Sequence, residues 1–306
     1  MSQKIGFIGV GSMGAALAGR LVDDHALLVH DLNPAAADQL VEGGAVFATP
    51  REIARACGVV FLSVPGPADV EKLVLGDDGL IEHLTPGSVV IDTTTSSPAL
   101  DAILVQALAA RGVEFADAGI AGGVRAVREG HGTLMVGASR DTFDRIRSLL
   151  EDITTTVFHV GSVGAGHTIK LVNNLLGYCN RFAALECVRI ADASGIDRAM
   201  AVDVINHSSG RNFTTESTYV KLWDGQRWNP MGFTLDLVRK DIGLATELAD
   251  DLGCAVPISA MVRGFVDTAI ERFGPKADQM RIMESWWEGA ESAVPMAPSV
   301  ISARTR

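Results

Sequence analysis

The sequence predicts an α/β fold in which a doubly wound parallel sheet is followed by an all-helical C-terminal domain, the two joined through one long interdomain helix. Three observations carry this prediction. Short apolar runs alternate with helical patterns in the first half of the chain, the strand signal ends near Gly161, and an apolar segment without proline then extends from Gly166 to Ala193. Strands that alternate with helices indicate right-handed βαβ units in one sheet.

Six short runs are expected to be strands, because they are apolar and rich in β-branched residues. They are 4–9, 26–30, 59–64, 88–92, 113–117 and 133–137, with helical patterns between them at 13–21, 35–42, 68–75 and 98–111. The run ALLVH at 26–30 is almost entirely apolar, as strands buried on both faces of a parallel sheet are.

The second half of the chain is expected to be helical. The segment from Gly166 to Ala193 predicts one helix of roughly seven or eight turns, and further helical patterns lie at 198–206, 233–252, 258–272 and 280–289. We therefore expect a sheet domain over residues 1–162, a helical domain over 163–290, and a tail over 291–306 that is rich in Pro, Ala and Ser and is a surface strap or disordered.

Composition excludes several classes of protein. The chain has 306 residues, 47% of them hydrophobic, and its 26 basic and 37 acidic side chains give a net charge of −11. This argues against intrinsic disorder and against a surface that tracks nucleic-acid phosphates. No apolar run reaches the length of a membrane span, of about 18 to 20 residues. Four cysteines without CxxC spacing are expected to be buried free thiols, so a cytoplasmic location is expected.

A glycine-rich loop follows the first expected strand. Its GxGxxG pattern comprises Gly9, Val10, Gly11, Ser12, Met13 and Gly14, and Asp31 follows at the end of the next strand. A loop that leaves a strand and opens a helix, with an acidic residue about 20 positions on, is typical of a dinucleotide-binding Rossmann-like domain. The alternative interpretation is an ordinary glycine-rich turn.

Asp31 bears on which dinucleotide binds. Its carboxylate can accept hydrogen bonds from a ribose diol but repels a 2′-phosphate, and the following Leu32, Asn33 and Pro34 supply no arginine. The sequence therefore favours NAD over NADP.

A polar island interrupts the long apolar helix. Lys170, Asn173 and Asn174 lie within about one helical turn, among leucine, isoleucine and valine. A lysine at such a place is costly to bury, and burial would lower its pKa toward the range that suits proton transfer. The alternatives are a lysine that extends to solvent, and asparagines that bond neighbouring helices.

Four motifs in one order give the chain a resemblance to the β-hydroxyacid dehydrogenase family, which includes 3-hydroxyisobutyrate dehydrogenases and tartronate semialdehyde reductases. They are the glycine loop, the run DAGIAGGV at 117–124, the run GAG at 164–166 followed by Lys170 and Asn174, and the pair Lys240-Asp241. The resemblance extends over roughly residues 4 to 290 and far exceeds a GxGxxG alone in specificity.

The resemblance implies a role for each matching residue. Lys170 matches the catalytic lysine that exchanges a proton with the substrate oxygen, and Asn174 matches the residue that orients substrate. The positions expected to line the cofactor are Val64, Pro65, Thr95 and Lys240; those expected at the substrate carboxylate are Ala121, Gly122 and Gly123. Thr95 could instead belong only to a helix cap, and Lys240 could be a solvated helix residue.

Ala121 is a departure from the family pattern, which usually has serine there. Loss of a hydroxyl donor would weaken carboxylate binding by about 1.5 to 3 kcal/mol unless another group replaces it. The candidate replacements are Arg125, Arg128, Arg211 and Asn212.

The sequence and this resemblance together predict an NAD-dependent oxidoreductase that interconverts a β-hydroxy carboxylate (a 3-hydroxyacid) and its aldehyde or ketone, with no metal, as a homodimer or homotetramer. The alternatives are an imine reductase-like enzyme, which the presence of Lys170 disfavours, and a non-catalytic NAD-binding sensor or scaffold. A 6-phosphogluconate dehydrogenase has a larger helical domain than 306 residues allow.

Overall fold

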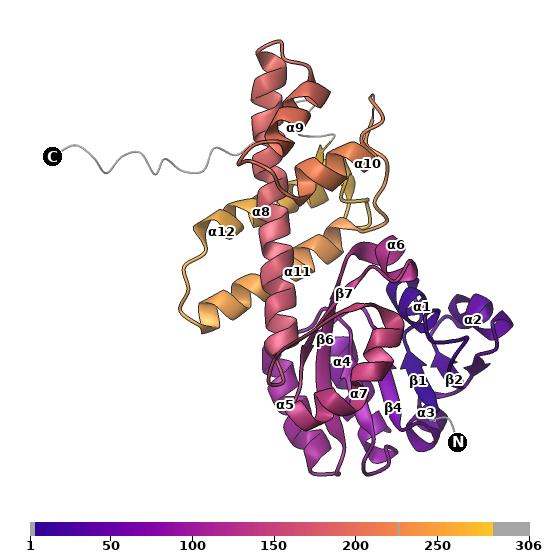
Figure 1. Ribbon diagram of the computed structural model, residues 1–306. Helices are drawn as coiled ribbons and strands as arrows, with labels where there is room; N and C mark the ends of the chain where they lie inside the picture. The colour runs from indigo at the N-terminus through magenta and orange to yellow at the C-terminus, as the bar shows by residue number, and fades with distance from the viewer. Residues whose placement is uncertain (1–3, 226, 284–306) are drawn as a thin grey trace. The chain divides into compact units, whose positions relative to one another are not determined.

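The computed structural model describes residues 4–225 and 227–283. The chain forms two compact units, Met1–Lys170 and Leu171–Arg306, coloured indigo to magenta and pink to yellow in Figure 1. Their boundary falls inside the continuous helix α8 (Ala165–Ala193), which confirms the expected long helix. The expected division at residues 162 and 163 stays a prediction, and the expected tail over 291–306 lies outside the described residues.

The first unit is built on one sheet of eight strands in the order β3-β2-β1-β4-β5-β6-β7-β8. The strands are β1 (Ile5–Ile8), β2 (Leu27–His30), β3 (Val46–Phe47), β4 (Val59–Leu62), β5 (Val89–Asp92), β6 (Glu114–Ala121), β7 (Thr133–Gly137) and β8 (Thr156–Gly161). The reversal of strand order on either side of β1 and β4 confirms the doubly wound arrangement.

One strand pair departs from the expected parallel pairing. β6 continues beyond Asp117, where the expected strand ends, and its residues up to Ala121 pair antiparallel with β7. Only residues 122–132 connect these two strands, which is short for the crossover that a parallel pair requires. All other neighbouring strands in the sheet are parallel.

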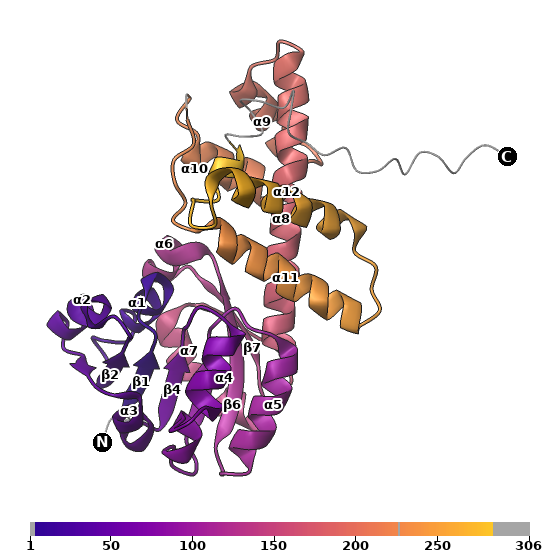
Figure 2. The same ribbon diagram turned by 180° about the vertical axis from the view of Figure 1, so that it is seen from behind.

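Helices cover both faces of the sheet (Figures 1 and 2). Successive residues of a strand serve opposite faces: Phe7 stacks on Phe61 in one hydrophobic cluster, whereas Ile8 and Leu62 belong to the other. The first cluster includes residues from α1 (Ser12–Ala18), α6 (Gly123–Arg128) and α7 (Arg140–Ile153); the second includes residues from α3 (Pro50–Ala56), α4 (Pro67–Leu75) and α5 (Pro98–Ala109). The expected helix at 35–42 is a 3₁₀ turn, η1 (Pro34–Ala37), followed by α2 (Asp38–Glu42).

In the described part of the second unit, the regular elements are helices joined by loops, with isolated β-bridges in addition. Tyr178 and Phe182 of α8 pack with side chains of α11 (Leu235–Asp251) and α12 (Pro257–Phe273). α9 (Arg198–Asn206), the π-helix η3 (Thr214–Tyr219) and α10 (Val220–Leu222) complete it. The helices expected at 198–206, 233–252 and 258–272 are confirmed; most of the one expected at 280–289 lies outside the described residues.

Two remaining expectations concern cysteines and membranes. The four cysteines are free, and Cys57 is buried, but Cys187 and Cys254 are exposed, so the expected burial is wrong for these two. Among the described residues, none of the helices combines the length and apolarity that a membrane crossing needs.

Candidate functional site

The glycine loop leaves β1 in a conformation that its glycines make possible. Gly9 has φ +87°, and a Cβ there would lie 2.2 Å from the carbonyl oxygen of Ser63. A Cβ at Gly14 would lie 1.9 Å from the carbonyl oxygen of Gly9, so α1 packs directly on the loop. A Cβ at Gly11, the N-cap of α1, would meet nothing within 4 Å. The backbone of the loop is thus open to a neighbour at Gly11, which suits a dinucleotide.

Asp31, just after β2, is bonded to this loop. One carboxylate oxygen accepts a hydrogen bond from the Val10 amide at 2.9 Å, and the other accepts one from the Asn33 amide at 2.9 Å. Asp31 is half-buried, whereas Leu32, Asn33 and Pro34 are exposed. Each carboxylate oxygen has a second lone pair, so the side chain can still accept hydrogen bonds from a diol.

The loops after β4 and β5 are also joined to each other. The Val64 amide donates to Thr94 Oγ1 at 3.2 Å, and Thr93 Oγ1 donates to the Leu62 carbonyl at 2.7 Å. Because Ile8 pairs with Leu62 and Leu62 pairs with Asp92, the parallel strands β1, β4 and β5 end level with one another, at the carboxyl-terminal edge of the sheet. That edge brings together most of the residues predicted to bind cofactor: Gly9, Val10, Gly11, Ser12, Met13, Gly14, Asp31, Val64, Pro65 and Thr95.

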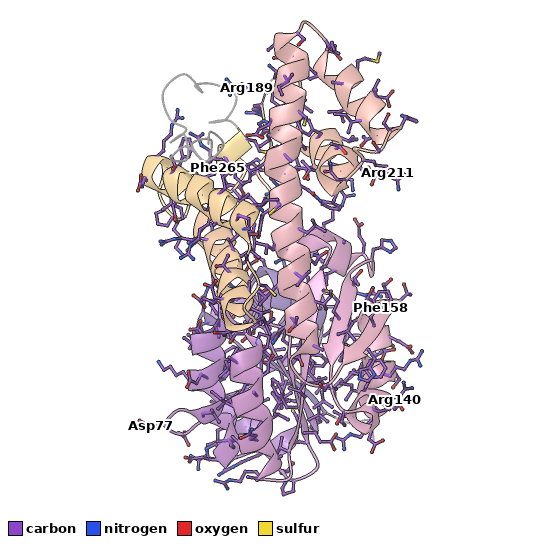
Figure 3. The ribbon with its side chains drawn as sticks, turned by 90° about the vertical axis from the view of Figure 1, so that its left-hand side faces the viewer. Asp77, Arg140, Phe158, Arg189, Arg211 and Phe265 are labelled. Carbon is purple, nitrogen blue, oxygen red and sulfur yellow. The ribbon has the colours of Figure 1, made fainter. Side chains whose placement is uncertain are left out.

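The segment predicted to hold a substrate carboxylate ends β6. Ala121 is its last residue, and Gly122 and Gly123 have φ of +115° and +75° as the chain turns into α6. Both glycines are exposed, so their backbone lies at the surface of the first unit. The exposed side chain of Arg125 in α6 forms an ion pair with Glu129 at 2.8 Å. Arg211, labelled in Figure 3, forms one with Glu216 at 3.1 Å. Two candidate replacements for the missing serine hydroxyl are therefore already engaged.

The beginning of α8 is fixed to β6 by a buried carboxylate. Asp117 accepts hydrogen bonds from the Gly164 and His167 amides, both at 2.7 Å, and so satisfies donors that an α-helix leaves unpaired at its start. Lys170 follows one turn later, half-buried. A Cβ at Gly119 would lie 2.6 Å from Lys170 Cβ, so the side chain of Lys170 passes directly over β6.

Beside this contact lies a buried group of charges that no sequence motif indicates. His167 Nδ1 lies 2.8 Å from Asp101 Oδ2, and neither side chain is exposed to solvent. Asp92, at the end of β5, is also fully buried and accepts a hydrogen bond from the Thr94 amide. We call Asp92, Asp101 and His167 the buried triad. Asp101 has no signal in the sequence, because it lies within an otherwise regular helix pattern.

Burial and charge shift the pKa values in the triad. Burial raises the pKa of Asp92 to about 6, against the opposing effect of His167. Burial alone would lower the pKa of His167, but the charge and hydrogen bond of Asp101, with the charges of Asp92 and Asp117, outweigh it and raise that pKa to about 9. His167 is therefore an imidazolium at neutral pH, and it compensates nearby carboxylates.

In the second unit, Asp241 connects three polar side chains. This buried carboxylate accepts hydrogen bonds from Asn174 Nδ2 at 2.8 Å and from the Tyr178 hydroxyl at 3.3 Å, and lies 3.3 Å from Lys240 Nζ. Asn174 and Lys240, both predicted site residues, are thus brought to one carboxylate. In the sequence, Asp241 is only the second residue of the Lys240-Asp241 motif. In the fold, its carboxylate also accepts the hydrogen bonds of Asn174 and Tyr178. Asn173, the other polar neighbour, is exposed.

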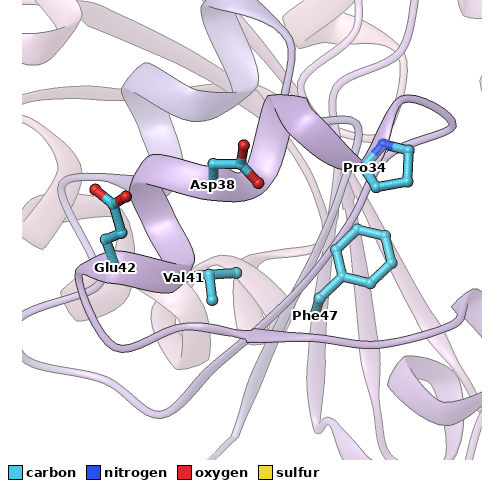
Figure 4. A pocket seen from close by; sticks show the side chains of 5 residues that line it. All are labelled: Pro34, Asp38, Val41, Glu42 and Phe47. Carbon is cyan, nitrogen blue, oxygen red and sulfur yellow. The ribbon is translucent and has the colours of Figure 1, made fainter.

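Neither the surface hollow nor the possible metal-ligand groups coincide with the predicted cofactor residues. A hollow on the side of α2 is lined by Pro34, Asp38, Val41, Glu42 and Phe47 (Figure 4). Its two carboxylates and lack of basic groups do not suit a phosphate. Among the described residues, two groups of three could offer metal ligands, namely Asp78, Glu82 and His83, and the buried triad.

Both units match family models. Residues 4–161 match the NAD binding domain of 6-phosphogluconate dehydrogenase, and residues 164–286 match the NAD-binding model of NADP-dependent 3-hydroxyisobutyrate dehydrogenase. The chain is 30% identical over 290 residues to 2-(hydroxymethyl)glutarate dehydrogenase of Eubacterium barkeri, covering 93% of this chain and 95% of the relative. It is 32% identical over 268 residues to an NAD-dependent L-serine dehydrogenase of Pseudomonas aeruginosa, covering 85% and 89%.

One solved structure resembles this chain over nearly the whole length of both proteins. The crystal structure of 3-hydroxyisobutyrate dehydrogenase from Salmonella typhimurium superposes with a TM-score of 0.80 at 28% identity, covering 92% of this chain and 99% of that one. The similarity thus includes the sheet unit, α8 and the helices that follow it.

Proposed function

The chain belongs to the β-hydroxyacid dehydrogenase family, and on that premise we propose that it is an NAD-dependent oxidoreductase that interconverts a β-hydroxy carboxylate with its aldehyde or ketone. One observation carries the proposal. Lys170 lies half-buried over β6 at Gly119, one turn beyond the capped start of α8, and β6 then ends in the Ala121-Gly122-Gly123 segment. A basic side chain thus lies over the same strand whose end leads into the exposed Gly122 and Gly123.

Lys170 is the proposed general acid and base. When carbonyl is reduced, its ammonium donates a proton to the carbonyl oxygen; when alcohol is oxidised, its amine accepts the hydroxyl proton. Asn174, whose amide is oriented by its hydrogen bond to Asp241, is proposed to orient the substrate. A nicotinamide cofactor supplies or accepts the hydride when bound. The remaining contribution of the protein is to hold the reacting groups in position.

The proposed cofactor residues follow the edge described above, with Lys240 added from the second unit. The close packing of Gly9 and Gly14 and the open backbone at Gly11 fit a bound pyrophosphate. Asp31 supports NAD rather than NADP, because no arginine follows it to neutralise a 2′-phosphate. An NAD-dependent relative at 32% identity is consistent with this preference.

The proposed substrate is a small hydroxycarboxylate or semialdehyde, with its carboxylate on the amides of Gly122 and Gly123. The relatives named above act on hydroxymethylglutarate and serine, which share a hydroxymethyl group near a carboxylate. Ala121 cannot supply the hydroxyl that the family usually has, so this chain is proposed to prefer a substrate that does not depend on that donor.

A homodimer or homotetramer in the cytoplasm completes the proposal. Several apolar side chains of α8 are exposed in the single chain, among them Val172, Leu176 and Ile190, the last by 67%. Apolar exposure of this kind is typical of surfaces that associate.

The experiment is substitution of the proposed acid and base. Lys170→Ala should bind NADH as the parent enzyme does, measured by cofactor fluorescence, while turnover of the best substrate in a hydroxyacid panel falls by about 10² to 10⁴. Lys221→Ala, which removes an exposed lysine of α10, serves as the matched control. Retained turnover in Lys170→Ala would remove the mechanism. Activity with imines alone, or cofactor binding without turnover, would instead favour the imine reductase or sensor alternatives.

A further inference from the structure

The buried triad joins three separate elements of the first unit. Asp92 ends β5, Asp101 lies in α5 and His167 lies in the first turn of α8. All three side chains have no solvent exposure, and within the described part of the chain neither Asp92 Oδ2 nor His167 Nε2 has a hydrogen-bond partner. The triad therefore keeps several charges in the interior without full pairing.

Such an arrangement contributes little net stability to a fold. Desolvation of a buried ion pair commonly cancels its attraction, and apolar residues of similar volume often stabilise a protein as well or better. The positions of the triad suggest another role. His167 precedes Lys170 by three residues, which places their Cβ atoms about 5 to 6 Å apart, and Asp92 immediately precedes the loop with Thr94 and Thr95.

We propose that His167, held by Asp101, is a positioning residue that fixes both the place and the electrostatic environment of Lys170. This inference rests on the proposed function of Lys170. His167 is held twice: its backbone amide donates to Asp117 at 2.7 Å, and its ring lies 2.8 Å from Asp101. Movement of the first turn of α8 would break both contacts, so the bonds to His167 restrain Lys170 one turn later.

The charges around His167 give the electrostatic part of the inference. The groups that face it are carboxylates from three packed elements: Asp92 of β5, Asp101 of α5 and Asp117 of β6. They keep the imidazole protonated at neutral pH, so a positive charge is held one turn before Lys170. The imidazolium offsets part of this negative charge, so it reduces the stabilisation that the carboxylates would otherwise give to the protonated form of Lys170.

The test separates position from charge with two substitutions at His167. His167→Ala removes both, whereas His167→Asn places an amide N–H close to the position of Nδ1, so it keeps a donor for Asp101 and removes only the charge. We expect kcat at saturating cofactor to fall by about 10- to 100-fold in His167→Ala and in Asp101→Ala, with the KM for NAD nearly unchanged. We expect His167→Asn to recover most of kcat, measured at the pH where each variant turns over fastest.

A direct measurement on Lys170 tests the charge without relying on activity. The rate of trinitrophenylation of Lys170 is followed against pH by peptide mapping, with exposed Lys221 of the same protein as internal reference. In His167→Asn the midpoint for Lys170 should move to higher pH by about one unit, while that for Lys221 stays in place. Because asparagine preserves the hydrogen bond to Asp101, this variant gives the answer even if His167→Ala does not fold.

Two results would overturn the inference: an unchanged Lys170 midpoint in His167→Asn, or parental kcat in His167→Ala. Loss of melting temperature alone, with kcat unchanged, would likewise assign the triad to stability only. Failure of the proposed function is distinguishable, because it appears as retained turnover in Lys170→Ala whatever the result at His167.

Discussion

Asp31 accepts a hydrogen bond from the amide of Val10 at 2.9 Å, so the acidic residue at the end of β2 is joined directly to the glycine loop. A second bond, from the Asn33 amide, holds the other oxygen of the carboxylate. The carboxylate is therefore fixed in place before any cofactor binds. A fixed negative charge at this position opposes a 2′-phosphate more effectively than one that can rotate away.

This fixed charge predicts the cofactor preference. Asp31→Asn removes the charge and keeps the side-chain shape, so we expect the ratio of kcat/KM for NAD to kcat/KM for NADP to fall by about tenfold or more, a change of at least about 1.4 kcal/mol. Steady-state kinetics with both cofactors measures it. Asp38→Asn, which neutralises an exposed carboxylate of α2, is the control and should leave the ratio unchanged. If the parent enzyme preferred NADP, the premise that Asp31 favours NAD would be wrong.

The end of β6 predicts an effect on substrate but not on cofactor. Ala121→Ser restores a hydroxyl beside the Gly122 and Gly123 amides, and one charge-assisted hydrogen bond contributes about 1.5 to 3 kcal/mol. We expect the KM for carboxylate substrates to fall by about tenfold or more, with the KM for NAD unchanged. Ala109→Ser at the exposed end of α5 controls for the added hydroxyl. Equal effects on both constants, or none, would count against this placement of the carboxylate.

The main architecture of the fold could be predicted from the sequence, but two of its strands and one strand pairing could not. Apolar runs and the proline-free segment after Gly161 predicted the doubly wound sheet and α8, because periodicity and length are local properties. β3 was missed because its two exposed residues carry no periodicity. β8 was missed because no residue of this edge strand is buried, and the apolar Phe158 and Val160 are exposed (Figure 3 labels Phe158). The antiparallel pairing of β7 follows from the short connection between β6 and β7. The sequence does not indicate this short connection, because β6 extends to Ala121 and not to the expected end at Asp117.

The candidate site shows the same division. Gly9, Gly14 and Asp31 could be predicted because their spacing reflects one strand, one turn and one helix. The pairing of Asp101 with His167 could not, since it joins residues 66 positions apart in different helices. Asp241 stood in a noted motif, but its contact with Asn174 depends on how α8 and α11 pack.

That contact predicts a loss of activity at a residue outside the proposed proton path. Asp241→Ala removes the acceptor for Asn174 Nδ2 and the partner of Lys240, so we expect kcat/KM for substrate to fall by about 10- to 100-fold as Asn174 loses its orientation. Asp251→Ala, at the exposed end of the same helix, is the matched control. Circular dichroism of both variants checks that the helices remain. Parental kcat/KM in a folded Asp241→Ala would show that Asn174 needs no such support.

The raised pKa of His167 predicts how stability depends on pH. Its value of about 9 in the folded chain exceeds the ordinary 6.5 of an unfolded one, so the folded state binds an extra proton between these values. The stabilisation is complete below pH 6.5 and is lost as pH rises through about 9, an effect on the order of 3 kcal/mol. Urea unfolding at pH 6.5 and 9 should therefore show a smaller decline in His167→Gln than in the parent, whereas the control His207→Gln, an exposed histidine, should match the parent. An equal decline in all three proteins would mean that His167 is not protonated in the folded chain.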